Sequence, residues 1–142
     1  MLEFRVSDPF LNDTKISRVV PDTQRWEQQA AYFIDTHPRV ESFATNAGLG
    51  FSIPYTDAGE RHDDVPDFLL RLSGGLHLIF ETKGFDPKME VKRTAAERWV
   101  HAVNRHGGFG AWRYCLCRDP ARTRELIDAL QQDALDMRAD AR

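Results

Sequence analysis

Three residues near the middle of the chain have the types and spacing that metal-assisted hydrolysis requires. Asp67 lies early in a predicted strand over 65–72, and Glu81 and Lys83 lie late in the next predicted strand, over 76–83. A hairpin centred on Gly74 would place Asp67 opposite Glu81. Because side chains alternate along a strand, Lys83 shares their face. The sequence therefore predicts two carboxylates and an ammonium group close together on one face of a sheet.

This arrangement suits a divalent cation. Two carboxylates directly across a strand pair repel each other, and a cation held between them turns that repulsion into coordination. Carboxylates completed by water are typical ligands of Mg²⁺. Lys83 would then position a water molecule, help to deprotonate it, or steady the charge that develops on a phosphate. The alternative is an ordinary ion pair of Glu81 with Lys83 on an exposed sheet face, since such pairs are common.

The charge is distributed unevenly, although the chain of 142 residues has a net charge of only -3. Residues 53–70 contain five acids and one arginine, and residues 83–113 contain seven basic residues and three acids. An acidic stretch followed by a basic one is typical of a site that holds a cation beside a polyanion. The alternative is two solvated surfaces of opposite charge. The basic stretch predicts phosphate contacts from four side chains, namely Lys88, Lys92, Arg93 and Arg113.

The elements that must position these residues alternate between helix and strand. Apolar periodicity predicts a helix over 24–36, a second ending near 104 and a last one from 119 onward, with strands over 40–43, 49–55, 65–72, 76–83 and 112–117. This order predicts an α/β domain with a mixed central sheet flanked by helices. We expect residues 1–20 to be an N-terminal arm or the remnant of a longer chain, 21–120 the core, and 121–142 a C-terminal helix.

Composition excludes several other classes of protein. Hydrophobic residues make up 42% of the chain, which is enough for the core of one domain. The longest apolar run covers only residues 30–34, too short for a membrane span or a secretion signal. Cys115 and Cys117 are one residue apart, which argues against a disulfide scaffold and favours the cytoplasm. We therefore expect no membrane partner.

The ordered motifs resemble those of a known nuclease family. Pro66-Asp67, followed after 13 residues by Glu81-Thr82-Lys83, matches the PD-(D/E)xK signature. The wider pattern is similar to the nuclease domain at the C-terminal end of type III restriction enzyme restriction subunits. The similarity spans residues 18–120 and includes Trp26-Glu27, Val40-Glu41-Ser42-Phe43, Leu49-Gly50-Phe51, His62-Asp63 and Glu81-Thr82-Lys83-Gly84.

The resemblance implies a restriction-endonuclease-like αβββαβ core and a Mg²⁺-dependent DNA endonuclease, with Mn²⁺ as a possible substitute. It implies that Asp67 and Glu81 hold the metal, that the Thr82 carbonyl adds a ligand, and that Lys83 serves the attacking water. Glu27 falls where such nucleases often place a helix-borne acid that supports the metal site. A solvated helix acid is the alternative for Glu27.

The chain also departs from the parent enzymes. It has no G-x-x-x-x-G-K-[ST] motif, so no ATP site is expected, and ATP-driven translocation is not carried over. The resemblance implies double-stranded DNA as the substrate, and helicase domains and a modification subunit as partners. We expect the chain to be an excised nuclease domain or the remnant of a larger chain. A repair or recombination nuclease of the same fold, and a cleavage-incompetent module that binds DNA or docks to a subunit, remain open alternatives.

Overall fold

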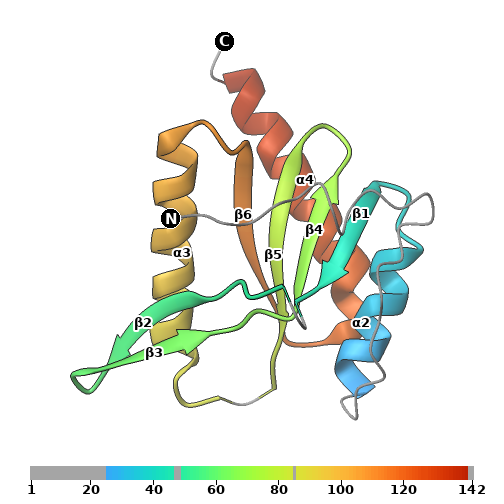
Figure 1. Cartoon of the computed structure of the whole chain (residues 1–142). Coiled ribbons are helices and arrows are strands. Elements are labelled where there is room, and N and C mark those ends of the chain that lie inside the picture. The colour runs from blue at the N-terminus through green and yellow to red at the C-terminus, as the bar shows by residue number, and fades with distance from the viewer. Residues whose placement is uncertain (1–24, 47–48, 85, 141–142) are drawn as a thin grey trace.

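The computed structural model describes residues 25–46, 49–84 and 86–140 (Figure 1). Its elements are α2 (Arg25–Asp35), β1 (Val40–Thr45), β2 (Ile53–Asp57), β3 (Glu60–Asp64), β4 (Phe68–Leu72), β5 (Leu76–Thr82), α3 (Met89–His106), β6 (Ala111–Cys117), the short 3-10 helix η1 (Pro120–Arg122) and α4 (Thr123–Asp140). The predicted α/β class with a mixed sheet is confirmed. The expected N-terminal arm, residues 1–20, lies outside the described residues. Each described helix is too short or too polar to cross a lipid bilayer.

The main sheet has four strands in the order β1-β4-β5-β6. The β1–β4 and β4–β5 pairs are antiparallel, and β5–β6 is parallel. A parallel pair needs a long crossover connection, and α3 supplies it. The strands β2 and β3 form a separate two-stranded sheet that projects beyond the main one, beside α3 (Figure 1).

Helices cover both faces of the main sheet, so its side chains alternate between two cores. Leu78 and Phe80 of β5 pack in the core that contains residues of α2 and α4, whereas Ile79 packs in the core that contains residues of α3. Because β5 is covered on both sides, it is buried almost throughout. Glu81 has the same parity as Ile79, so the alternation places it on the α3 face.

The β4–β5 hairpin has the register that the sequence predicts. Phe68 pairs with Phe80 and Leu70 with Leu78, which is a hairpin centred on Gly74. Gly74 and Gly75 have φ angles of 92° and 94°, in the left-handed region that favours glycine. The turn therefore sets which residues of the two strands meet at the open end of the hairpin.

The strand β3 is the main element that the sequence did not predict. Glu60–Asp64 has no apolar alternation, and we expected only a turn at residues 57–59 before the next strand. The structure pairs β3 with β2 through a tight turn in which Ala58 and Gly59 both have positive φ. This pairing places Asp64 opposite Ile53, at the base of the β2–β3 hairpin.

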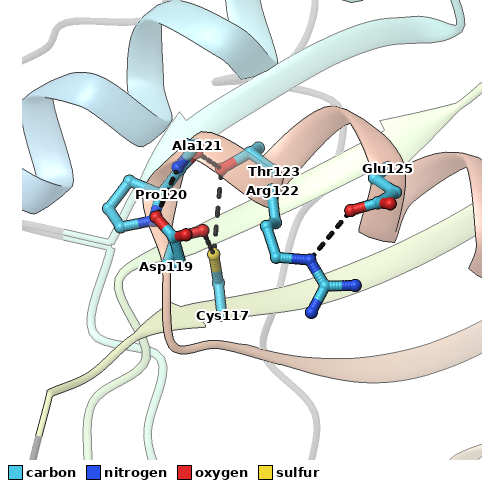
Figure 2. Close-up of polar contacts among 7 residues, drawn as sticks. All are labelled: Cys117, Asp119, Pro120, Ala121, Arg122, Thr123 and Glu125. Atoms are coloured by element: carbon cyan, nitrogen blue, oxygen red, sulfur yellow. Dashed lines mark hydrogen bonds and ion pairs between the residues drawn. The ribbon is translucent and has the colours of Figure 1, made fainter.

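The connection from β6 to α4 is closed by local hydrogen bonds (Figure 2). Asp119 Oδ1 accepts from the Ala121 N–H at 3.1 Å, and Thr123 Oγ1 donates to the Pro120 carbonyl at 2.7 Å. The Cys117 thiol donates to the Asp119 carbonyl at 3.1 Å. Both cysteines are free and buried, so they contribute to packing.

Candidate active site

Asp67 lies at the open end of the β4–β5 hairpin, next to the end of β5. Phe68 and Phe80 are the pair of the ladder furthest from the turn, and Asp67 and Glu81 are the next residues beyond them on the two strands. Asp67 Oδ2 accepts hydrogen bonds from the Thr82 N–H at 2.8 Å and the Thr82 hydroxyl at 3.1 Å. Both bonds use one oxygen, and Oδ1 forms none within the described part of the chain. Asp67 is thus fixed to β5 with one oxygen available.

Glu81 is a fully buried carboxyl group at the end of β5. Its Oε2 accepts a hydrogen bond from the Tyr114 hydroxyl at 2.5 Å, and among the described residues no N–H or hydroxyl group donates to its buried Oε1. Tyr114 lies on β6, opposite Ile79. Burial, followed by the charge and hydrogen bond of Glu81, raises the pKa of Tyr114, so the phenol stays protonated and donates. Tyr114 therefore holds one oxygen of Glu81 and leaves the other without a donor.

Asp64 is a third carboxyl group at this end of the sheet. It is 5% exposed, and its Oδ2 is buried without a partner. Burial is the largest of the causes that together raise the pKa of Glu81 to about 8, and the charge of Asp64 is the second. The Tyr114 hydrogen bond opposes the rise, whereas a hydrogen bond with Asp64 and the charge of Asp67 add smaller contributions to it. The effect of the Asp64 charge on the pKa of Glu81 therefore indicates that the two carboxyl groups lie close together.

The sequence analysis missed Asp64 and Tyr114 as site residues. Asp64 belongs to the acidic cluster over 53–70, but only the β2–β3 pairing brings it to this position. Tyr114 reaches Glu81 through the parallel β5–β6 pairing. A signal for it does exist, because a tyrosine in a buried strand usually needs a partner for its hydroxyl.

The donor chemistry of the three carboxyl groups fits a divalent cation. Buried acceptor oxygens without donors are costly, and a proton or a cation relieves that cost. Glu81 Oε1 and Asp64 Oδ2 are two such oxygens. Over residues 25–46, 49–84 and 86–140, however, no group of three or more His, Cys, Asp or Glu side chains is already arranged around a metal position. Asp64, Asp67 and Glu81 are therefore neighbours, but their oxygens are not arranged around a common metal position in this structure.

Lys83 has the free ammonium group at this edge. Its backbone N–H donates to the Cys117 carbonyl at 3.1 Å, which continues the alignment with β6. Its side chain is half-buried and has no ion pair or hydrogen bond with a residue that the structure describes. The parity of β5 places Lys83 on the same face as Glu81. Hydrogen bonds from Lys92 and Lys88 chiefly lower the pKa of Asp86, and the charge of Lys83 adds to this effect, so the Lys83 ammonium group lies within electrostatic reach of Asp86.

Glu27 lies in the first turn of α2 and is half-buried. The neighbouring Trp26 ring lies 3.8 Å from the position that a Cβ on Gly84 would occupy. The start of α2 is thus beside Gly84, but α2 packs on the face of the sheet that carries Leu78 and Phe80, so the supporting role of Glu27 stays a prediction.

The four basic residues predicted to bind DNA each have a partner in the structure. These contacts are Lys88 with Asp57 at 3.4 Å, Lys92 with Asp86 at 2.8 Å, Arg93 with Glu97 at 3.3 Å and Arg113 with Asp133 at 3.5 Å. Burial lowers the pKa of Lys92, but the Asp86 bond and the charges of Asp86 and Asp64 raise it more. Lys92 is thus near the carboxyl cluster, whereas Arg113 lies against α4 on the opposite face of the sheet.

The buried acid makes a testable prediction about stability. The pKa of Glu81 rises from 4.5 to about 8 on folding, so its neutral form favours the folded state below pH 4.5. That contribution is lost as the pH rises toward 8, with a slope of up to about 1.4 kcal/mol per pH unit. We expect Glu81→Gln to remove this part of the slope in urea titrations performed in EDTA. Glu97→Gln, on the exposed side of α3, is the control, and equal slopes in the two variants would contradict the prediction.

The chain was compared with models of protein families, with curated proteins and with solved structures, and no match was found in any of them. The candidate site is therefore defined by its own residues and their geometry. Asp67, Glu81 and Lys83 lie where the central strands β4 and β5 end, and Asp64 lies at the base of the β2–β3 hairpin close to Glu81.

Proposed function

We propose that this chain is a Mg²⁺-dependent DNA endonuclease domain of the PD-(D/E)xK type, which hydrolyses phosphodiester bonds. The observation that carries the proposal is the buried carboxyl pair of Glu81 and Asp64, with an unpartnered oxygen on each. Holding like charges together out of water destabilises the fold unless a cation or proton compensates. The raised pKa of Glu81 is consistent with a proton in that role when no metal is bound, and a divalent cation would replace the proton and compensate both carboxyl groups.

The order of the elements supports the family part of the proposal. Between β1 and β4 the chain inserts the β2–β3 hairpin, which belongs to a separate sheet. Without this insertion the order is α2-β1-β4-β5-α3-β6, which is the αβββαβ order that the sequence resemblance implies. The signature residues Asp67, Glu81 and Lys83 fall at the end of the central β4–β5 hairpin.

The residues have distinct roles in this proposal. Asp67, Glu81 and Asp64 would hold Mg²⁺, which when bound supplies a Lewis acid that lowers the pKa of water and neutralises phosphate charge. Thr82 orients Asp67, and Tyr114 orients Glu81. The Lys83 ammonium group would position the attacking water or steady the negative charge on the phosphate.

Metal dependence is the direct test. We expect the protein to convert supercoiled plasmid DNA to nicked circles with Mg²⁺ or Mn²⁺, and to lose this activity in EDTA. The product bands on an agarose gel measure the rate. Nicking that continues at the same rate in EDTA would contradict the proposal, because the carboxyl groups would then have no cation to hold.

A second candidate is a module that binds DNA or docks to a subunit without cleaving. It is favoured by the absence, among the described residues, of a preformed group of three metal-binding side chains. Such a module would bind duplex DNA and leave it intact with every metal. Comparing binding with nicking on the same DNA separates the two candidates.

A further inference from the structure

A groove of about 670 Å³ lies between the β2–β3 hairpin and α3. The hairpin crosses the lower part of α3, and β2 contacts the helix (Figure 1). Polar side chains line the groove from both walls, namely Thr56 and Arg61 from the hairpin and Glu90, Thr94 and Arg98 from α3. Two cations and the hydroxyl groups of two threonines thus share one surface hollow with one acid, and Tyr55 lines it as well.

The two arginines of this groove differ from the basic residues considered so far. Arg61 and Arg98 are exposed, and neither forms an ion pair or hydrogen bond with any residue in the described ranges. By contrast, Lys88, Lys92 and Arg93 each contact an acidic side chain. An exposed guanidinium group without an acidic partner is free to bind an anion, and its planar fork suits the oxygens of a phosphate.

The groove adjoins the carboxyl cluster. Tyr55 lines the groove. Burial lowers the pKa of Lys92, whereas the charges of Asp86, Asp64 and Tyr55 raise it, so Tyr55 and Asp64 both lie near the Lys92 ammonium group. Ile53, opposite Asp64, lies two residues from Tyr55 along β2, a separation of about 7 Å. The groove therefore begins close to the proposed cleavage site and leads away from it along the hairpin.

We propose that this groove holds the phosphate backbone of the duplex DNA next to the cleaved bond. Arg61 and Arg98 each contact a phosphate, and the hydroxyl groups of Thr56 and Thr94 donate further hydrogen bonds. The inference rests on the proposed function for its choice of ligand. In this proposal the main contacts with the DNA backbone come from the β2–β3 hairpin and α3, at residues that the sequence pattern did not single out.

The test measures how DNA affinity depends on salt. Anisotropy of a labelled duplex of arbitrary sequence is recorded in EDTA, so that cleavage does not interfere. The double variant Arg61→Ala/Arg98→Ala is expected to reduce the slope of log affinity against log salt by about 2, because each lost phosphate contact removes about 0.9. The matched control is Arg122→Ala/Arg138→Ala, which removes the same charge on the η1 and α4 side of the sheet and should leave the slope unchanged. Equal slopes in the two double variants would overturn the proposal, as would a wild-type protein that binds no duplex.

A change at Glu90 provides a test of opposite sign. Glu90 lines the same groove and would repel a phosphate there. Glu90→Gln should raise the DNA affinity about two- to fivefold, the effect of one exposed charge, and an unchanged or lower affinity counts against the groove. If thermal melts show that the arginine variants are unfolded, the Glu90→Gln affinity alone tests whether the groove binds phosphate. Because both arms measure binding without metal, a reduced salt slope together with no nicking would reject only the proposed activity.

Discussion

Replacing Glu81 by glutamine, or Asp67 by asparagine, is expected to lower the plasmid-nicking rate about a thousandfold. A loss of that size corresponds to about 4 kcal/mol of transition-state stabilisation, the scale of the charge stabilisation that a bound cation supplies. Glu81 Oε1 and Asp67 Oδ1 are the oxygens that their hydrogen bonds leave free. An amide at either position would present a neutral oxygen or a nitrogen to the cation.

Both variants should remain folded. The glutamine carbonyl can still accept the hydrogen bond from Tyr114, and the asparagine carbonyl can still accept those from Thr82. Glu81→Gln also removes the unfavourable charge interaction with Asp64. Its melting temperature at pH 8 in EDTA should therefore equal or exceed that of the wild type.

A matched control separates the loss of the site from a general loss of charge. Asp63→Asn alters an exposed acid on β3, next to Asp64 in sequence, and should nick at the wild-type rate. A marked fall in the melting temperature of both site variants would show that Asp67 and Glu81 serve the fold. Wild-type nicking by either variant would remove that residue from the metal site.

The sequence allowed the central hairpin to be predicted well, for a physical reason. The two-glycine turn determines the register of this short hairpin, because both strands are apolar on both faces and their side-chain alternation alone would not fix which residues meet. This register predicts Asp67 and Glu81 at the same end of two neighbouring strands, and the structure has them there. Local signals were sufficient because the two strands are joined by a short turn.

The remainder of the candidate site depends on contacts that local patterns do not contain. The polar strand β3 is held by its ladder with β2 and by the turn at Ala58 and Gly59, so hydrophobic periodicity did not reveal it. Tyr114 meets Glu81 through a parallel pairing that follows an 18-residue helix. The basic stretch was visible as composition, but composition does not show which cations already have an acidic partner.

Lys83→Arg is expected to reduce nicking about a hundredfold although it preserves the charge. The ammonium group of lysine is a compact donor that can share or release a proton, whereas a guanidinium group is broad, planar and always protonated. A group that positions or deprotonates the attacking water contributes about 10² to 10⁴ in rate. Lys83 has no ion pair within the described residues, and it follows β5 directly, two residues after Glu81.

The kinetic constants and the binding measurements show which role of Lys83 is correct. If Lys83 acts on the water, the loss falls on kcat, with KM and the metal-free DNA affinity nearly unchanged. If it only balances the negative charge of the carboxyl groups, arginine should preserve the rate within about threefold. Lys88→Arg, at an exposed lysine already paired with Asp57, is the matched control and should keep the wild-type kcat. Lys83→Ala alone would not distinguish the roles, because it removes the charge and the transferable proton together.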